Sequence, residues 1–440
     1  MRHLFAMLIE RIVYFLRGFW TAKRFAKANR SKVKRYQQKK LNKLLARVSH
    51  TIPYYHSYTG QELNTYPIID KKQFLHHFST INRLGLSLQQ CETHALTAEH
   101  SRDFTPQLKG ISVGLSSGTS QRRGVFMVSQ EEQAQWAGYI IAKNIPFTFK
   151  QTKVTLFLRA NSNLYEASNG KLIQFRFFDL TLQFETLMSE LEAFSPDILI
   201  APAHVLGMIA QHKPGIHPIK IISVAEVLED ATRKQVEHTF QQPVHEIYQA
   251  TEGYLASTCT HGSLHLNEDI VIVEKEWLCR ESGRFIPIIT DLNRRTLPII
   301  RYRLDDVLIE DPRPCVCGSS FTRLKKIEGR TDDMLWLTCI NTGKLKSVFP
   351  DLIRRAMYLG EHPIDDYTIT QENTLLHIHY DGQQPEKIPQ QIHTNLTALF
   401  SSLHLHAPDI HFSHGVTHTI TQKRRRISCK QKPFTEAATQ

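Results

Sequence analysis

The chain has 440 residues, of which 41% are hydrophobic and 22% charged, with 20 Gly and 19 Pro. This composition is typical of a folded protein of two or three domains, and it excludes collagen-like, low-complexity and wholly disordered chains. No window approaches 18 uninterrupted apolar residues, which argues against a membrane-spanning helix. The apolar N-terminus contains Glu10 and Arg11 and lacks a small-residue cleavage site, and the seven Cys form no disulfide framework. We therefore expect a cytoplasmic protein.

The net charge of +12 is concentrated at the N-terminus. Residues 1–50 contain 14 Lys and Arg and a single acid, Glu10, a net charge of +13, so the other 390 residues together carry −1. Residues 2–47 contain no Pro and one Gly, and apolar residues recur at helical spacing, which predicts a basic amphipathic helix. We favour a helix packed on its own domain, and leave open a peripheral contact with the inner membrane face or a partner. No nucleic-acid motif accompanies the charge, so we expect no nucleic-acid partner.

The chain divides into three predicted parts: a basic helical segment at 1–60, a large domain at 61–330 and a small domain at 331–440. Residues 66–70 are predicted to be a linker into the large domain. There, apolar strands at 154–158, 198–200, 219–224 and 286–290 alternate with helical patterns at 131–143, 182–194 and 231–240. This alternation indicates an α/β fold with a mainly parallel sheet. Beyond a break near Gly329, two helices (351–358, 389–399) and three strands (367–369, 375–380, 410–412) predict a small α+β domain.

A run of Ser, Thr, Gly and Arg at residues 116–124 is the strongest local signal. Gly lets backbone N–H groups face an anion, hydroxyls add donors and Arg supplies countercharge, so the run suits a phosphate. It is neither a P-loop nor a GxGxxG fingerprint, and alone it is equally typical of a surface turn.

Three further segments follow in order, and each by itself is more typical of ordinary structure. Residues 248–253 place Glu252 beside Thr251, where the acid could hold Mg²⁺ on a nucleotide. Residues 302–306 offer carboxylates that could pair with ribose hydroxyls, and residues 328–333 lie on the predicted domain boundary.

In order and spacing, these segments resemble the core motifs of the adenylate-forming (acyl-CoA synthetase) superfamily, on the branch of phenylacetate–CoA ligase and coenzyme F390 synthetase. The resemblance covers nearly the whole chain, including residues 51–55 and 66–71. It implies a large adenylating domain and a small mobile α+β lid. It also implies ATP and Mg²⁺ as cofactors, and coenzyme A or phosphopantetheine as the thiol, the latter on an acyl carrier protein.

The resemblance also implies roles by position. The phosphate loop over ATP would comprise Ser116, Ser117, Gly118, Thr119, Ser120, Arg122 and Gly124. Ala225 and Tyr248 would flank adenine, Thr251 would contact phosphate, and Glu252 would hold Mg²⁺.

Further along the chain, Asp306 would bind both ribose hydroxyls with Arg330 beside it, and Asp332 would be the hinge of the small domain. Lys423 would reach the substrate carboxylate and the α-phosphate. The acyl pocket would be lined by residues 159–165 and 201–205.

The sequence departs from the usual pattern at three places. Gln121 stands where Gly is usual in the phosphate loop, Asp305 precedes the ribose acid, and Gln422 precedes Lys423. A non-catalytic nucleotide-binding scaffold is therefore kept as an alternative.

Three Cys and one His form a candidate metal site. Cys259 and His265 lie six apart, and Cys315 and Cys317 follow about fifty residues later. Three thiolates and one imidazole make a closed tetrahedral zinc site of the structural type, and the phenylacetate–CoA ligase branch resembles this chain in carrying one. His261 is a rival to His265, and free thiols are the alternative.

These observations favour an ATP-dependent ligase that converts a carboxylic acid, with an aryl acid preferred, to acyl-AMP and pyrophosphate. The acyl group then passes to a thiol. The alternative reaction is adenylyl transfer to a hydroxyl, as the resemblance to F390 synthetase allows.

Overall fold

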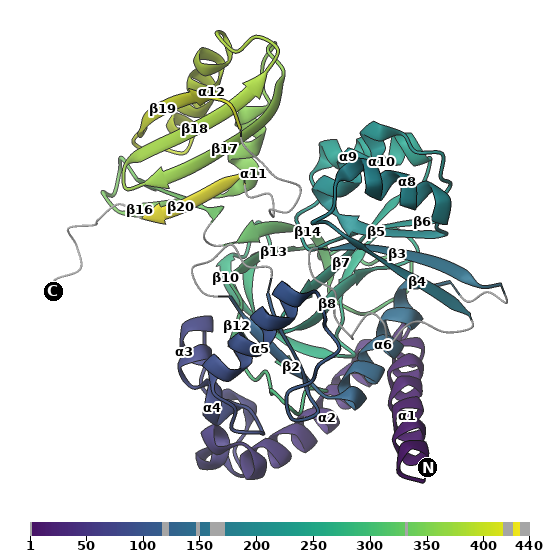
Figure 1. The fold of residues 1–440 in the computed structure, drawn as a ribbon. Coiled ribbons are helices and arrows are strands. Elements are labelled where there is room, and N and C mark those ends of the chain that lie inside the picture. Colours follow the sequence, from purple (N-terminus) through teal and green to yellow (C-terminus); the bar gives the residue numbers. More distant parts are fainter. Residues whose placement is uncertain are drawn as a thin grey trace. The chain divides into compact units, whose positions relative to one another are not determined.

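A computed structural model gives the fold (Figure 1) and describes residues 2–116, 123–146, 150–158, 172–330, 333–416 and 426–431, with only the backbone described in residues 2–7 and at Asp351. The chain forms two compact units. Unit 1 comprises Met1–Leu304 and Ile309–Lys326, and unit 2 comprises Asp305–Leu308 and Ile327–Gln440. No described helix has the length and apolar content that crossing a membrane requires.

Unit 1 begins with two long helices, α1 (Arg2–Phe25) and α2 (Arg30–Thr51). The basic segment is thus two helices and not one, because the chain turns between Phe25 and Arg30, where Asn29 caps α2 by accepting a hydrogen bond from the Lys32 backbone N–H. α2 buries Leu44 and Val48 in the core of unit 1, so it packs on its own domain as the sequence analysis favours.

The predicted linker at residues 66–70 is wrong. Tyr66 and Ile69 are buried, and Ile69 forms a parallel bridge with Tyr302. The Ile69 backbone N–H donates to Arg301 O at 3.1 Å, and Ile69 O accepts from the Arg303 N–H at 2.9 Å. Pro67 suggests a linker in sequence, but the apolar residues on either side of it pack into unit 1.

The other helices of unit 1 include three, α8 to α10, that lie together beside the parallel strands (Figure 1). Their bounds are α3 (Lys71–His76), α4 (Phe78–Ile81), α5 (Leu88–Ser101), α6 (Gln130–Asn144), α8 (Phe184–Phe194), α9 (Ala203–His212) and α10 (Asp230–Phe240), with the short 3-10 helices η1 (Pro53–Tyr58) and η2 (Leu63–Thr65).

The strands up to residue 330 form a hairpin and one large sheet. They are β1 (Ser112–Leu115), β2 (Val125–Val128), β3 (Thr152–Leu158), β4 (Ile173–Asp179), β5 (Ile198–Pro202), β6 (Lys220–Val224), β7 (Val244–Ala250), β8 (Gly253–Thr258), β9 (Leu264–Leu266), β10 (Val271–Cys279), β11 (Arg284–Asp291), β12 (Tyr302–Arg303), β13 (Asp306–Glu310) and β14 (Arg323–Arg330).

The large sheet confirms the α/β class and is half parallel. Among the described residues its order is β10-β11-β13-β14-β9-β8-β7-β6-β5-β3-β4, with β12 paired to β11. The pairs from β4 through β3, β5 and β6 to β7 are parallel, whereas β7 with β8, β8 with β9, β9 with β14, and β10 with β11 are antiparallel. The strands of the pairs β7–β8, β8–β9 and β10–β11 are joined by connections too short for a crossover helix, which accounts for their antiparallel pairing.

Unit 2 has its own apolar core, which includes Ile378, Ile392 and Phe400. A sheet in the order β19-β18-β17-β20 and the hairpin β15-β16 combine with two helices, as expected for a small α+β domain. The elements are β15 (Leu335–Thr338), β16 (Leu345–Val348), α11 (Pro350–Met357), β17 (Ile364–Glu372), β18 (Leu375–Gly382), α12 (Ile388–Ser402), β19 (Asp409–His414) and β20 (Ile427–Gln431).

Candidate active site

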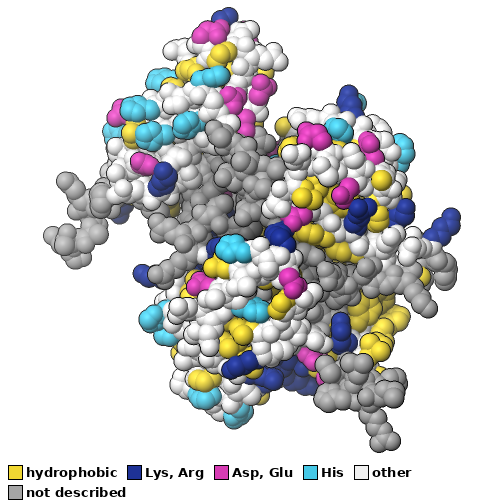
Figure 2. All heavy atoms as spheres, in the orientation of Figure 1, with side chains coloured by type: hydrophobic (Ala, Val, Ile, Leu, Met, Phe, Trp, Pro, Cys, Tyr) yellow, Lys and Arg dark blue, Asp and Glu magenta, His cyan; other side chains and the backbone are white. Residues whose placement is uncertain are grey.

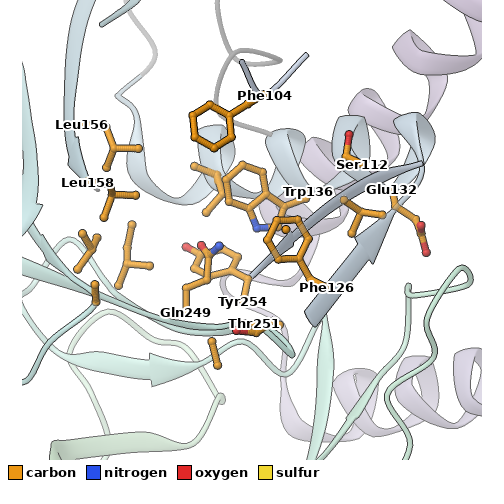
Figure 3. A pocket seen from close by; sticks show the side chains of 18 of the residues that line it. Phe104, Ser112, Phe126, Glu132, Trp136, Leu156, Leu158, Gln249, Thr251 and Tyr254 are labelled. Atoms are coloured by element: carbon orange, nitrogen blue, oxygen red, sulfur yellow. The ribbon is translucent and has the colours of Figure 1, made fainter. Parts of the chain in front are cut away.

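Unit 1 contains a cavity of about 530 Å³ (Figure 3). Its wall is mainly apolar: Leu156 and Leu158 come from β3, Trp136 from α6 and Phe126 from β2, and Phe104 lies across from them. The polar side chains of Gln249 and Thr251 enter from the end of β7. The cavity can therefore enclose a mainly apolar group next to a polar one.

Helix α6 positions Trp136 through a strong N-terminal cap. Ser129 and Glu132 form a capping box, in which the Ser129 Oγ accepts from the Glu132 backbone N–H. The Glu132 carboxylate also accepts from the Thr296 hydroxyl at 2.6 Å and the Thr296 backbone N–H at 3.0 Å. These bonds fix the first turn of α6 to the segment that follows β11.

The described ends of the predicted phosphate loop close the β1-β2 hairpin. The Ser116 N–H donates to Gly124 O at 2.7 Å, and the Gly124 N–H donates to Ser116 Oγ at 2.7 Å. Arg123 donates from Nε to Ser116 O at 2.6 Å and makes a bidentate ion pair with Glu99 of α5, at 2.6 and 2.7 Å. Arg123 is thus already engaged in holding the base of the loop.

The loop base lies next to the segment 248–252. A Cβ atom added to Gly124 would lie 3.6 Å from both Ser116 Oγ and Thr251 Oγ1. The structure therefore brings Thr251 next to Ser116 and Gly124, which lie far from it in the sequence. Tyr248 is buried, and the described residues of β7 and directly after it that line the cavity are Ile247, Gln249, Ala250 and Thr251.

Ala225 lines the cavity at the carboxyl end of β6 and has the left-handed backbone conformation, with φ of 66°. Only a few non-Gly residues adopt this conformation, which is found preferentially at functional sites. The next residue, Glu226, accepts a hydrogen bond from the backbone N–H of His204 at 3.3 Å and contacts His204 Nδ1 at 2.7 Å. This pair links the predicted adenine segment to the segment 201–205.

A polar turn that was not predicted from the sequence follows β11 and lines the cavity. Arg294 donates from Nη2 to Thr251 O at 2.6 Å, and Asp291 Oδ1 accepts from the Asn293 and Arg294 backbone N–H groups at 2.7 and 3.0 Å. Burial raises the pKa of Asp291, although Arg294 and these N–H groups favour its charged form. The polar residues Asp291 and Asn293 to Arg295, at and after the end of an apolar strand, are the signal that could have indicated this turn.

In unit 2 the predicted ribose acid and its basic neighbour lie together. Arg330 places Nε 3.8 Å from Asp306 Oδ1 and Nη2 3.3 Å from Asp305 Oδ2. The Arg330 backbone N–H donates to Asp333 Oδ2 at 2.8 Å. The Arg330 guanidinium thus lies between two adjacent carboxylates and contacts both.

Several predicted site residues lie outside the described residues. They are Ser117, Gly118, Thr119, Ser120 and Arg122 of the phosphate loop, residues 159–165 of the acyl pocket, Asp332 and Lys423.

The four predicted metal ligands come together in unit 1. The ligand atoms of Cys259, His265, Cys315 and Cys317 all lie within 4.8 Å of one another. Cys259 Sγ is 3.8 Å from Cys315 Sγ, and Cys317 Sγ is 3.6 Å from His265 Nε2. Tetrahedral zinc with bonds of about 2.3 Å to sulfur separates neighbouring sulfurs by ~3.8 Å, so the spacing fits zinc.

The surroundings of this cluster also suit a metal. His265 is buried, and its Nδ1 lies 3.1 Å from Phe321 O, an arrangement that leaves Nε2 as the ligand atom. Turns at 259–263 and 315–318 present the thiols, and Gly318, with φ of 76°, closes the second turn by donating its N–H to Cys315 O. His261 is exposed and is not a member of the cluster among the described residues.

The sequence of this chain was compared with protein families and with individual proteins. No family model matches the sequence. Protein CapK of Staphylococcus aureus is 27% identical over 158 residues, which are 34% of this chain and 34% of that protein. Phenylacetate-coenzyme A ligase of Thermus thermophilus is 25% identical over 207 residues, 42% of this chain and 44% of that protein. The matches thus span between a third and a half of the relatives' length.

Solved structures match over most of the chain. The postadenylation state of 2-hydroxyisobutyryl-CoA ligase with R3-HIB-AMP has a TM-score of 0.64 at 13% identity, over 92% of this chain and 91% of that one. An open conformation of the same ligase with 2-HIB-AMP and CoA has a TM-score of 0.55 at 12% identity, over 88% and 90%. The chain therefore has the fold of these ligase structures, and its sequence similarity to protein CapK and to phenylacetate-coenzyme A ligase is partial.

Proposed function

We propose that the protein is an ATP-dependent acid–thiol ligase. The observation that carries this proposal is the meeting of Ser116, Gly124 and Thr251 beside the apolar cavity. Hydroxyls and a Gly loop suit the phosphates of ATP, while the adjacent cavity suits the apolar part of a carboxylic acid. The partial similarity to phenylacetate-coenzyme A ligase supports the same reaction class.

In the proposed first step, a carboxylate oxygen of the acid bonds to the α-phosphorus of ATP, and the bond from that phosphorus to the bridging oxygen breaks. Pyrophosphate leaves with the bonding electrons. The nucleophile is already ionised, so the step needs no general base. Catalysis then consists of positioning and charge compensation. Ser116 to Gly124, with Arg122, would hold the phosphates.

Other residues would complete the site. Ala225 and Tyr248 would flank adenine, and Asp306 with Arg330 would hold the ribose. Glu252 would hold Mg²⁺, which supplies countercharge to the phosphates when bound.

In the proposed second step, a thiolate attacks the acyl carbon and AMP leaves, so a thioester bond replaces the acyl–phosphate bond. Lys423 would contact the carboxylate and α-phosphate in the first step, and the small domain would turn about Asp332 between steps. Coenzyme A or the phosphopantetheine of a carrier protein would supply the thiol.

We favour an aryl acid as substrate. Trp136, Phe126 and Phe104 provide aromatic surfaces in a cavity whose wall also contains many Ile, Leu and Val side chains, together with polar ones. Aromatic rings pack favourably against one another at edge-to-face or offset angles. The cavity volume of about 530 Å³ lies within the range of small-molecule sites.

We assign Cys259, His265, Cys315 and Cys317 as a structural zinc site. Four protein ligands leave no open position for water, so the metal would stabilise the fold and take no part in the reaction. A peripheral contact of residues 1–50 with a membrane or a partner also belongs to the proposal.

The test is carboxylate-dependent exchange of labelled pyrophosphate into ATP, over a panel of aryl and fatty acids with Mg²⁺. We expect exchange with aryl acids, and a thioester product when coenzyme A is added. Exchange that yields an adenylylated hydroxyl in place of a thioester would favour the F390 synthetase-like alternative. ATP binding without exchange for any acid would favour the scaffold.

Lys423→Ala should abolish exchange while leaving ATP binding unchanged, because the lysine would act on the developing charge at the α-phosphate. Lys430→Ala is the matched control, since Lys430 is largely exposed and pairs with Glu372 at 3.0 Å. Unchanged exchange in Lys423→Ala would remove this lysine from the mechanism.

A further inference from the structure

The outer face of α1 is apolar and exposed. Six large apolar side chains spaced three or four residues apart along this helix are between 43% and 64% exposed: Leu8, Ile9, Ile12, Val13, Leu16 and Trp20. Figure 2 shows hydrophobic side chains gathered where α1 lies in Figure 1. Single exposed apolar residues are common, but a continuous stripe along a helix marks an interaction surface.

The opposite face of α1 is fixed against α6. A Cβ atom added to Gly18 would lie 2.1 Å from Gln135 O, and one added to Gly138 would lie 2.1 Å from Phe15 O. The two helices thus cross with their backbones in close contact. Because this crossing sets the rotation of α1, the apolar stripe cannot turn inward to become part of the core.

Basic side chains border the stripe. Arg17 lies one turn from Val13 and Trp20, and Arg24 lies one turn beyond Trp20. Lys23 and Lys27 follow at the same end, and residues 1–50 contain Glu10 as their single acid. On α2, burial and the neighbouring cations Arg17 and Arg295 lower the pKa of Lys40 to about 8. This part of the surface therefore carries a high density of positive charge.

We propose that α1 lies in the plane of an anionic lipid bilayer, with its apolar stripe among the acyl chains and its basic residues at the lipid phosphates. An apolar stripe bordered by Lys and Arg is the pattern of interfacial helices. A second copy of the chain is disfavoured as the occupant, because two segments of net charge +13 would face each other. This inference is independent of the proposed reaction.

The test is co-sedimentation of the full chain with vesicles of phosphatidylcholine, with and without phosphatidylglycerol. We expect binding to the anionic vesicles that weakens as salt is raised. Ile12→Glu/Leu16→Glu should weaken it by about tenfold or more, because two apolar groups are replaced by carboxylates. Arg17→Gln/Arg24→Gln should weaken it ~fivefold for each charge removed.

Ile340→Glu is the matched control. Ile340 is 54% exposed and lies in unit 2, so the same substitution there should leave vesicle binding unchanged. Unfolding midpoints equal to that of the original chain would show that the variants fold. Anionic vesicles that fail to bind the chain, or that bind Ile12→Glu/Leu16→Glu equally well, would overturn the proposal. So would a dimer that this double variant converts to a monomer, since the face would then join two copies.

Discussion

Asp305 and Asp306 are adjacent carboxylates that share Arg330, and only one of them corresponds to the ribose acid. If Asp306 binds the ribose hydroxyls, Asp306→Asn should weaken ATP binding by about 2 kcal/mol, or ~thirtyfold, the value of hydrogen bonds to a charged group. Asp305→Asn keeps the same volume and serves as the control, with little expected change. Calorimetric titration with ATP measures both, and a larger loss in Asp305→Asn would move the ribose assignment by one residue.

His245 on β7 supplies a pH prediction. Burial, followed by Lys220 and Arg233, lowers its pKa to about 4, and among the described residues its enclosed Nδ1 has no hydrogen-bond partner. The unfolded chain binds a proton near pH 6.5, whereas the folded chain does not until about pH 4. The stability that neutral His245 contributes is therefore complete above pH 6.5 and is lost as the pH falls toward 4.

His245→Asn should consequently lose less stability than the original chain between pH 6.5 and pH 4. Urea midpoints across this range measure the difference. His56→Asn, at an exposed position, should follow the original chain. Identical pH profiles for His245→Asn and the original chain would mean that His245 is not held neutral.

At the scale of elements, the crossing of α1 and α6 predicts a strong response to one methyl group. Gly138→Ala would place a carbon 2.1 Å from Phe15 O and 2.9 Å from Phe19 N, which forces the helices apart. We expect a loss of about 1–3 kcal/mol in the free energy of unfolding, the cost of overpacking. Gly215→Ala, which meets nothing within 4 Å, is the control. Equal urea midpoints for the two variants would contradict a close crossing.

Elements with long periodic patterns were predictable from the sequence, and short ones were not. Helix α6, predicted at 131–143, runs over Gln130–Asn144 because its capping box and apolar period agree. The strands β12 and β9 have two and three residues, too few to show an alternation. These two strands were therefore missed.

The same contrast applies to the candidate site. The Cys and His spacing predicted the metal cluster, because few other roles place three Cys and a His in such short segments. Asp291 and Arg294 were missed, since a polar run after a strand is usually an ordinary turn. Their contact with Thr251 depends on a tertiary packing that no local pattern encodes.

For the whole molecule, the two units predict separable thermal transitions. Each has its own core, and all four proposed zinc ligands belong to unit 1. A chelator should therefore lower the transition temperature of unit 1 and leave that of unit 2 unchanged, because loss of a structural metal costs folding free energy. Differential scanning calorimetry measures both transitions.

Cys317→Ser should reproduce the effect of the chelator, and Cys279→Ser, outside the cluster, should not. Metal analysis should find about one zinc per chain in the original protein and less in Cys317→Ser. A chelator that shifts both transitions equally would contradict a metal confined to unit 1.

The placement of two tryptophans has a practical consequence. Trp20 is 64% exposed on the outer face of α1, whereas Trp136 projects into the cavity of unit 1. Indole fluorescence shifts to shorter wavelength in an apolar environment. Binding to vesicles should therefore shift the emission of Trp20, and binding of an aromatic acid should shift the emission of Trp136. A soluble quencher should reach the first indole more readily than the second. In a variant that keeps only these two of the four tryptophans, Trp20 would report surface attachment and Trp136 would report cavity occupancy.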